Sequence, residues 1–360
     1  MSPLRLPADP QFRTLIGVGG IGGGMFLALE GDETLGREES RGAHLLDARD
    51  ACKLHIVAHH VAVLTGADLS GTPFRVLPIG YVGDDDPGRA AIAALRSAGI
   101  DTAHVVTLPD RPTLFSVCFQ YPDGTGGNLT TLDSAAAALT EADIDALEPL
   151  VAADGPRTIA LAAPEVGLGP RRRLLELATR HGAFRVASFV SGEVGSARDD
   201  GLFEIADLVA LNADEASTLA GRALDPAAPD VVLAALVAAT GADRRPLRLV
   251  VTAGASGAFA FDDGRWHHRA SIPVDVSSTA GAGDALLGGV LAGIAAGVPL
   301  VPASDAPSAE LTCALDLGVL LAAVSVISPD TIAPHADLPS LVSLADRAQV
   351  AFGPPLSDVL

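Results

Sequence analysis

Residues 278–289, STAGAGDALLGG, place one carboxylate, Asp284, between a glycine-rich turn and a long apolar segment. Small residues let the backbone approach a ligand closely, and the free amides at a helix start favour an anion. We therefore predict that Gly281, Ala282 and Gly283 form an anion hole. A carboxylate beside it could take a proton from a hydroxyl while the amides stabilise a transferring phosphoryl group. The alternative is that Asp284 only caps its helix.

Composition narrows the class of protein. Of 360 residues, 49% are hydrophobic and 19% are charged, so the chain can bury a large core. The formal net charge of −20 argues against a nucleic-acid or anionic-membrane partner. Three scattered cysteines, Cys52, Cys118 and Cys313, cannot all pair and lack metal-ligand spacing, so we expect a reduced, cytoplasmic protein. Residues 1–15 contain no apolar stretch typical of a signal peptide.

Two apolar runs follow the glycine-rich turn, at residues 285–304 and 311–327. The first could span a bilayer on length alone. It contains glycines and prolines, however, and the second run carries Asp316. We therefore predict two helices packed inside an α/β protein, and no membrane partner.

The rest of the chain alternates short apolar runs with helical patterns, which predicts a mostly parallel sheet covered by helices. The predicted strands are residues 14–21, 74–83, 157–164, 184–190, 206–212 and 247–254. The predicted helices are residues 86–100, 170–181, 213–221 and 230–241, and residues 257–274 read as a hairpin with DDG as its turn.

Two segments, residues 24–50 and 111–131, do not fit this alternation. The second has a period-two pattern broken by PDGTGG. The two segments predict either a small lid beside the main sheet or a peripheral hairpin without a role. We expect one domain over residues 1–350, with both segments inserted in it, and a C-terminal tail at 351–360.

Four motifs, in order along the chain, resemble the ribokinase (PfkB) family of sugar and nucleoside kinases. The sequence STAGAGD is similar to the family's D-T-x-G-A-G-D. Residues 78–101 resemble its G-x-V-G-x-D-x-x-G…G-V-D block, residues 211–221 its N-x-x-E motif, and residues 250–261 its V-T-x-G-x-x-G motif. The resemblance covers roughly residues 14–340.

This resemblance implies a ribokinase-like α/β fold, a three-layer Rossmann-type sandwich with a mostly parallel central sheet and a small β lid. It implies ATP-dependent phosphorylation of a hydroxyl on a sugar or sugar-like acceptor, with Mg²⁺ as cofactor. Carried over by position, Asp284 would be the general base and the amides of Gly281, Ala282 and Gly283 the anion hole.

The resemblance also implies residues that bind the nucleotide and the metal. Asn212 and Glu215 would organise Mg²⁺ and the phosphates, partly through water. Taken alone, Glu215 could instead be an exposed acid favoured by a helix dipole. The remaining implied contacts are Thr252, Gly254 and Gly257 along the nucleotide, Thr279 near the phosphates, and the helix at 311–327 on the adenine side.

Positions that would face the acceptor depart from the family pattern. The glycine run at 17–24 lacks the Asp of the family's G-x-x-x-x-D, and the helix expected at 51–66 lacks its G-G-x-x-x-N residues. Ser278 replaces the first Asp of D-T-x-G-A-G-D, which leaves activation by a monovalent cation such as K⁺ open. We therefore expect an atypical acceptor.

Other residues could contact that acceptor. Lys53, the only lysine, could bind a phosphate or carboxylate on it, or be an ordinary solvated residue. Asn128 and Thr130, near the predicted lid, could bind acceptor hydroxyls. His55 and His59 share a helix face at a spacing that can bind zinc, but no third ligand is evident. We expect them to pack or to hydrogen-bond to substrate.

The leading hypothesis is therefore an ATP-dependent small-molecule kinase. Alternatives are a nucleoside kinase of the same fold and a catalytically silent relative that binds a nucleotide or metabolite. One Trp and two Tyr leave few residues to stack on a nucleobase, which favours a sugar. The chain lacks the P-loop sequence G-x-x-x-x-G-K-[ST]. A lid of few strands leaves unpaired edges, which a homodimer through the lid would cover.

Overall fold

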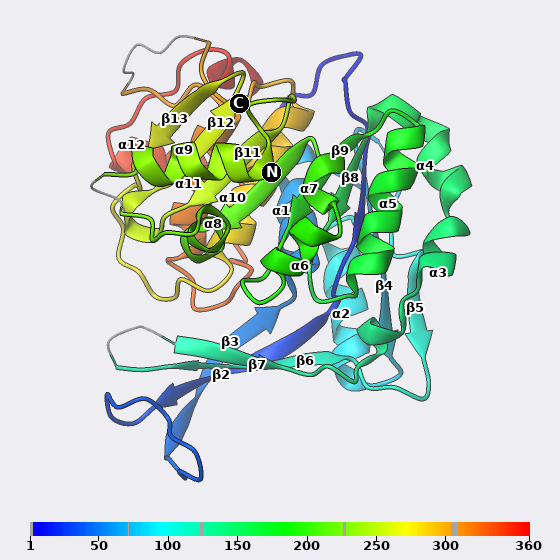
Figure 1. The fold of residues 1–360 in the computed structure, drawn as a ribbon, viewed down its shortest axis with the longest axis vertical. Coiled ribbons are helices and arrows are strands. Elements are labelled where there is room, and N and C mark those ends of the chain that lie inside the picture. The colour runs from blue at the N-terminus through cyan, green and yellow to red at the C-terminus, as the bar shows by residue number, and fades with distance from the viewer. Residues whose placement is uncertain (1–2, 71, 123–125, 226–227, 304–308) are drawn as a thin grey trace.

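A nine-stranded, mostly parallel sheet runs through the centre of the protein (Figure 1). The computed structural model describes residues 3–70, 72–122, 126–225, 228–303 and 309–360. The strand order is β13-β12-β11-β10-β9-β8-β1-β4-β5. The strands are β1 (Thr14–Val18), β4 (Arg75–Gly83), β5 (Val105–Leu108), β8 (Thr158–Ala162), β9 (Phe184–Ser188), β10 (Leu208–Asn212), β11 (Arg248–Thr252), β12 (Ala258–Asp262) and β13 (Arg265–Arg269).

Burial explains why the apolar runs form this sheet. Every residue of β1 and of β8 is buried, which is typical of parallel strands covered on both faces. All neighbouring strands from β5 to β11 along the sheet pair in parallel. The predicted hairpin is confirmed as β12 and β13, which pair antiparallel and turn through Asp263 and Gly264 at positive φ, 49° and 77°.

Helices cover both faces of the large sheet, which confirms the predicted three-layer α/β architecture (Figure 1). Helices α1, α2, α10 and α11 pack on one face, and α3 to α9 pack on the other. Helix α12 packs beside α11. The helices are α1 (Lys53–Thr65), α2 (Asp86–Ser97), α3 (Glu141–Asp145), α4 (Glu148–Asp154), α5 (Leu168–Arg180), α6 (Val194–Asp199), α7 (Leu202–Ile205), α8 (Ala213–Ala220), α9 (Asp230–Thr240), α10 (Ala282–Ala295), α11 (Ala314–Ser325) and α12 (Leu338–Arg347).

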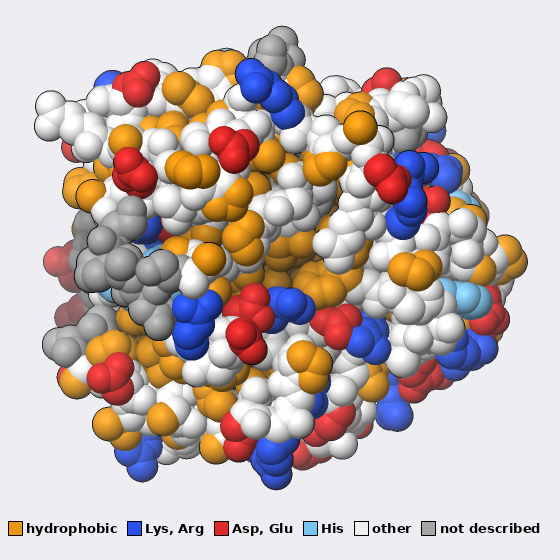
Figure 2. Space-filling view, turned by 90° about the horizontal axis from the view of Figure 1, so that it is seen from above, with side chains coloured by type: hydrophobic (Ala, Val, Ile, Leu, Met, Phe, Trp, Pro, Cys, Tyr) orange, Lys and Arg blue, Asp and Glu red, His pale blue; other side chains and the backbone are white. Residues whose placement is uncertain are grey.

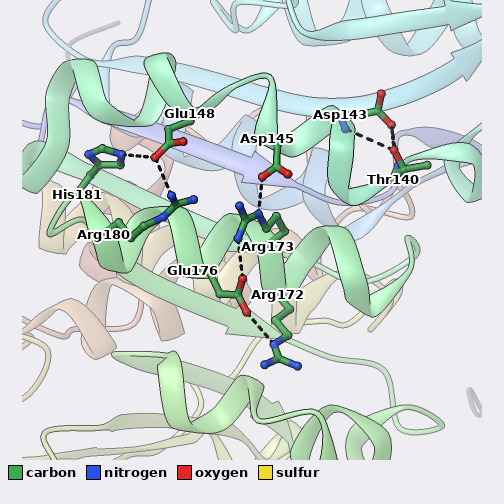
Figure 3. A network of polar contacts seen from close by, with 9 residues as sticks. All are labelled: Thr140, Asp143, Asp145, Glu148, Arg172, Arg173, Glu176, Arg180 and His181. Carbon is green, nitrogen blue, oxygen red and sulfur yellow. Dashed lines mark hydrogen bonds and ion pairs between the residues drawn. The ribbon is translucent and has the colours of Figure 1, made fainter.

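Ion pairs on the surface join α5 to the two short helices before it (Figure 3). Arg173 of α5 pairs with Asp145 at the end of α3. Glu148 of α4 lies 3.2 Å from Arg180 and 3.1 Å from His181, at the end of α5. Exposed pairs of this kind contribute about 0–1 kcal/mol each. These ion pairs therefore add little to the free energy of unfolding, and their main effect is on how the three helices are oriented.

A second, four-stranded sheet lies beside the large one, in the lower part of Figure 1. It contains β2 (Gly22–Leu29), β3 (Ala43–Ala51), β6 (Leu114–Gln120) and β7 (Gly126–Thr130), in the order β3-β2-β6-β7. The central pair, β2 and β6, is parallel, and the outer pairs are antiparallel. The segments at 24–50 and 111–131 thus meet in one small sheet, which we call the lid sheet. Residues 123–125 lie outside the described part.

The two apolar runs form packed helices, as predicted. Gly289 of α10 and Gly318 of α11 let these helices approach closely, since a Cβ on Gly289 would lie 2.8 Å from the Gly318 Cα. Among the described residues, no helix combines the length and the hydropathy that a membrane crossing requires. Residues 351–360, expected as a tail, pack onto the domain, where the side chain of Leu356 is fully buried.

Charges of both signs are mixed on the face of the molecule that points away from the lid sheet (Figure 2). Lys and Arg side chains lie among Asp and Glu side chains across this view. A nucleic-acid surface would instead gather its basic side chains in one patch or stripe. The described residues on this face do not form one.

Candidate active site

A cavity of about 570 Å³ lies at the carboxyl ends of β9, β10 and β11. Ser188, Asn212 and Thr252, the last residues of these strands, line it together with the first turn of α10. Parallel sheets place ligands here because strand ends meet helix N-termini. The cavity lining includes all the residues predicted to catalyse or to bind nucleotide and metal: Asp284, Gly281, Ala282, Gly283, Asn212, Glu215, Thr252, Gly254, Gly257 and Thr279.

The turn before α10 requires glycine at its centre. Gly281 is the N-cap and has a φ of 76°. A Cβ there would lie 2.8 Å from the carbonyl oxygen of Thr331, so conformation and space both exclude a side chain. The amide of Ala282 donates to the carbonyl oxygen of Thr279 at 3.3 Å. Among the described residues, the amides of Gly281 and Gly283 have no hydrogen-bond partner and are available to an anion.

Asp284 is the third residue of α10 and not its N-cap, so the capping alternative does not explain this carboxylate. Its side chain is 12% exposed, and its Oδ2 lies 3.4 Å from Nζ of Lys53. The charge of Asp284 raises the pKa of Lys53 above its usual value and outweighs the opposing effect of burial. The two side chains therefore form an ion pair at the cavity wall.

Asn212 and Glu215 form a capping box at the start of α8. The backbone N–H and the side-chain amide of Asn212 donate to the two carboxylate oxygens of Glu215, each at 2.8 Å. Glu215 N–H donates back to Asn212 Oδ1 at 2.9 Å. The alternative of an exposed Glu215 is wrong, because the residue is 4% exposed. Burial is the largest cause that raises the pKa of Glu215, to about 7.

The donor set at Glu215 suits Mg²⁺ held through water. Each carboxylate oxygen already accepts one hydrogen bond and keeps a second lone pair. Mg²⁺ prefers oxygen ligands and usually retains several waters, so it needs few direct protein contacts. Because Glu215 and Asp284 line the same cavity, a hydrated cation near Glu215 would also be near an anion at the α10 amides.

Part of the cavity wall is apolar. Val319, Ala322 and Ala323 of α11 line the cavity, and the contact of this helix with an adenine base stays a prediction. On the β11 side, Gly257 has a φ of 88°, and a Cβ there would lie 2.0 Å from the carbonyl oxygen of Arg269. A cavity lined both by apolar side chains and by free helix amides suits a ligand with an apolar part and an anionic part.

Comparison with known families agrees with this geometry. A model described as pfkB family carbohydrate kinase matches residues 61–337. The chain belongs to this family. The matched range contains the capping box, the β11 loop and the α10 turn, but it begins within α1, after Lys53.

Solved structures show the ribokinase-like fold of this PfkB family member. Ribokinase from Cryptococcus neoformans var. grubii serotype A, in complex with ADP, is 18% identical with a TM-score of 0.70, and the match covers 92% of this chain and 99% of that chain. Ribokinase from Arabidopsis thaliana, complexed with ribose and ATP, is 17% identical with a TM-score of 0.66, covering 92% and 98%. PfkB protein from Polaromonas sp. JS666 is 19% identical with a TM-score of 0.61, covering 92% and 99%.

Other predicted contact residues do not line this cavity. Asn128 and Thr130 are on β7, an edge strand of the lid sheet, and Asn128 is exposed. Their contact with an acceptor stays a prediction. His55 is buried in α1, and the described residues place no third metal ligand beside it and His59. The structure thus agrees with packing for His55.

Two carboxylates near Lys53 escaped the sequence analysis of this PfkB chain. Glu165 accepts a hydrogen bond from the backbone N–H of Lys53 at 3.1 Å. Asp50, near the end of β3, accepts hydrogen bonds from the side chains of Ser116 and Cys118. Glu165 directly follows a buried strand in ALAAPE, a position that faces ligands in parallel sheets and could have revealed it. Asp50 lies in a polar strand, where an acid carries no such signal.

Proposed function

We propose that this protein transfers the γ-phosphoryl group of ATP to a hydroxyl of a sugar or sugar-like acceptor, with Asp284 as general base. The position of Asp284 carries the proposal. Its carboxylate is mostly buried in the first turn of α10, in a cavity where the amides of Gly281 and Gly283 are free. Membership of a carbohydrate kinase family supports the reaction class.

In the transfer step, the acceptor hydroxyl gives its proton to Asp284 while its oxygen bonds to the γ-phosphorus. The bond between that phosphorus and the β–γ bridging oxygen breaks, and ADP leaves with the electron pair. The amides of Gly281 and Gly283 would donate to the phosphoryl oxygens, over which the negative charge is spread. Lys53 would hold the Asp284 carboxylate in one orientation through their ion pair.

Three further parts of the cavity would bind the nucleotide and its Mg²⁺. Glu215 would hold Mg²⁺ through water, and Asn212 fixes that carboxylate with two hydrogen bonds. When bound, Mg²⁺ neutralises part of the phosphate charge. The loop that contains Thr252, Gly254 and Gly257 would line the nucleotide. The apolar side chains of α11 would exclude water from its base.

The alternative of a catalytically silent relative predicts a lost base or a blocked anion hole. Neither is present here, because Asp284 faces the cavity and Gly281 keeps its left-handed conformation. This favours an active enzyme.

The test is ADP release with ATP and Mg²⁺ against a panel of sugars, polyols and nucleosides. Asp284→Asn should lower kcat by roughly 10²- to 10⁴-fold, which is the usual contribution of a general base. ATP affinity and the far-UV circular dichroism spectrum should be unchanged. Asp275→Asn, an exposed acid nine residues earlier, is the matched control and should keep full activity. Turnover of Asp284→Asn within threefold of wild type would refute the assignment, and failure to bind ATP would refute the nucleotide site.

A further inference from the structure

Three side chains that can ligate a metal lie together where α11 begins, beside the edge strand β13. They are His267 of β13, Cys313 at the N-cap of α11, and Asp316 in the first turn of that helix. An imidazole nitrogen, the thiol sulfur and a carboxylate oxygen lie within 4.8 Å of one another. The described part of the chain contains no second group of this kind. None of the three residues lines the active-site cavity.

Strand β13 directs His267 towards α11. Side chains alternate between the two faces of a strand, so His267 and Arg269 share one face. Arg269 Nε donates to Oδ1 of Asp316 at 2.6 Å, so this face is the one that packs against α11. Nε2 of His267 lies 3.8 Å from the same oxygen, which is too far for a hydrogen bond. This buried nitrogen has no hydrogen-bond partner among the described residues.

The start of α11 holds the other two side chains in place. The backbone N–H of Asp316 donates to the sulfur of Cys313 in a capping box. Oδ2 of Asp316 accepts hydrogen bonds from the N–H of Cys313 at 3.1 Å and of Thr312 at 2.6 Å. Both Cys313 and Asp316 are fully buried. Neighbouring groups commonly fix the ligands of metal sites by hydrogen bonds of this kind.

The types of ligand atom select the metal. A thiolate, an imidazole and a carboxylate suit Zn²⁺, whereas Mg²⁺ and Ca²⁺ prefer oxygen ligands alone. At the usual zinc bond lengths, tetrahedral ligand atoms lie about 3.3–3.7 Å apart. The His267 nitrogen and the Asp316 oxygen are already 3.8 Å apart. The remaining pairs need to close by no more than about 1.5 Å.

The valences and charges at this site also fit a divalent cation. Among the described residues, Oδ1 of Asp316 accepts one hydrogen bond, from Arg269, and keeps a second lone pair. The Cys313 thiolate and the Asp316 carboxylate together balance the two charges of Zn²⁺. The guanidinium of Arg269 also donates to the carbonyl oxygen of Glu310 at 2.8 Å, so it need not leave when the metal binds.

We propose that His267, Cys313 and Asp316 bind one Zn²⁺ ion, with water as the fourth ligand. The side chain of His267 is 26% exposed, which gives the ion and the water access from solvent. On binding, the Cys313 thiol gives its proton to solvent and its thiolate bonds to the metal. The sequence does not indicate this site, because His267 and the α11 residues are far apart along the chain.

The ion would fasten the start of α11 to β13. Three residues further along α11 line the active-site cavity, so the metal would fix one wall of that cavity from a distance. The site lies outside the proposed catalytic machinery, and its occupancy does not depend on the kinase assignment. It therefore goes beyond the proposed function.

The first experiment uses Co²⁺ as the probe, because Co²⁺ occupies tetrahedral zinc sites and absorbs light when a thiolate binds it. The whole chain is stripped of metal with a chelator and titrated with Co²⁺ under a phosphine reductant. Excess Mg²⁺ occupies the carboxylate site proposed at Glu215. We expect a near-ultraviolet charge-transfer band that saturates at one ion per chain and disappears when Zn²⁺ is added. Absence of the band overturns the proposal, and so does a band that persists in Cys313→Ser.

The second experiment measures Zn²⁺ affinity by competition with a chromophoric chelator. Cys313→Ser removes the thiolate but keeps a residue favoured at an N-cap, and His267→Gln removes the imidazole. Loss of a residue that only orients a ligand costs about 10- to 100-fold in metal affinity, so each ligand variant should lose at least about 100-fold. The matched controls are Cys118→Ser, at another buried thiol, and His268→Gln, at the exposed neighbouring histidine. Both controls should keep the wild-type affinity.

Thermal unfolding provides an independent readout. A metal that binds only the folded state raises its melting temperature. Zn²⁺ should therefore raise the melting temperature of wild type and of both controls, but not that of either ligand variant. Wild-type affinity in Cys313→Ser or His267→Gln, or an equal thermal shift in all five proteins, overturns the proposal. None of these measurements uses a phosphoryl acceptor, so their failure and the failure of the kinase assignment are distinguishable.

Discussion

His60 offers a test of the packing between α1 and α10. Its side chain is 0% exposed, and neither ring nitrogen has a hydrogen-bond partner among the described residues. A Cβ on Gly288 of α10 would lie 2.8 Å from the His60 Cβ, so the ring is enclosed at this contact. Burial lowers the pKa of His60 from 6.5 to about 3, and the nearby His59 and His55 add to the effect. The folded protein therefore keeps this ring neutral.

The pH dependence follows from the protons bound in each state. Between pH 6.5 and 3 the unfolded chain protonates His60 and the folded protein does not, so acid favours unfolding. At pH 5 the resulting loss in the free energy of unfolding is about 2 kcal/mol, from RT ln(1 + 10^1.5). At pH 8 it is close to zero because neither state is protonated.

His60→Leu removes this proton and fills a similar volume. We expect the free energy of unfolding of His60→Leu to gain about 2 kcal/mol over wild type between pH 8 and pH 5. Urea unfolding followed by circular dichroism at pH 8, 7, 6 and 5 measures this. His335→Leu, at an exposed histidine, is the control and should show no such change.

Subtracting wild type from the variant matters because other groups titrate in the opposite sense. Glu165 and Glu215 have pKa values raised from 4.5 to about 7, so the folded state binds their protons first. Their contributions to stability fall as the pH rises from 4.5 to 7. They are common to both proteins and cancel. The free energies of unfolding of His60→Leu and wild type are compared from pH 8 to pH 5. If their difference stays constant within about 0.5 kcal/mol, His60 is not held neutral by burial.

Three further predictions concern the site and its support. Lys53→Met should lower kcat about 10- to 100-fold with little change in ATP affinity, because Asp284 loses the ammonium that orients it. Steady-state kinetics measure both constants, and an unchanged kcat would contradict this role of Lys53. Gly264→Ala should lower the free energy of unfolding by about 1–2 kcal/mol, and Gly281→Ala should lower it by more. Both glycines have positive φ, but only Gly281 lacks space for a Cβ. Urea titrations measure both losses, and equal losses would argue against the clash. Asp316→Ala should lower the free energy of unfolding by about 3–5 kcal/mol, because the fully buried carboxylate of Asp316 pairs with the guanidinium of Arg269 on β13. A loss below about 1 kcal/mol in the same titration would show that the pair is not buried in solution.

The sequence predicted the large sheet well because its signals are local. Short apolar runs bounded by glycine or proline mark buried parallel strands without any tertiary information. The observed β1 ends at Val18, before the predicted residue 21, because Gly19 and Gly20 already lead into the lid sheet. Helix α2 ends at Ser97 and Gly99 follows at a φ of 79°, close to the predicted end.

The gathering of the glycine turn and the capping box in one cavity was predictable for a similar reason. The glycines satisfy local backbone requirements, and Asn212 and Glu215 are three residues apart in one capping box. The two carboxylates near Lys53 were not predictable, because Asp50 and Glu165 come from different sheets. Only strand register and the packing of the lid sheet bring them near Lys53, and neither is encoded in a short motif.

The single lysine has a consequence for protein chemistry. The side chain of Lys53 is 32% exposed, and its ammonium pairs with Asp284. Among the side chains, only Lys53 offers an amine to an acylating reagent or to an enzyme that acetylates lysine. The ion pair keeps the amine protonated and so slows its attack on an acylating reagent. The α-amino group reacts with the same reagents, so the mass increment is read on the peptide that contains Lys53. That increment reports the state of one ion pair, and ligands that fill the cavity should suppress it.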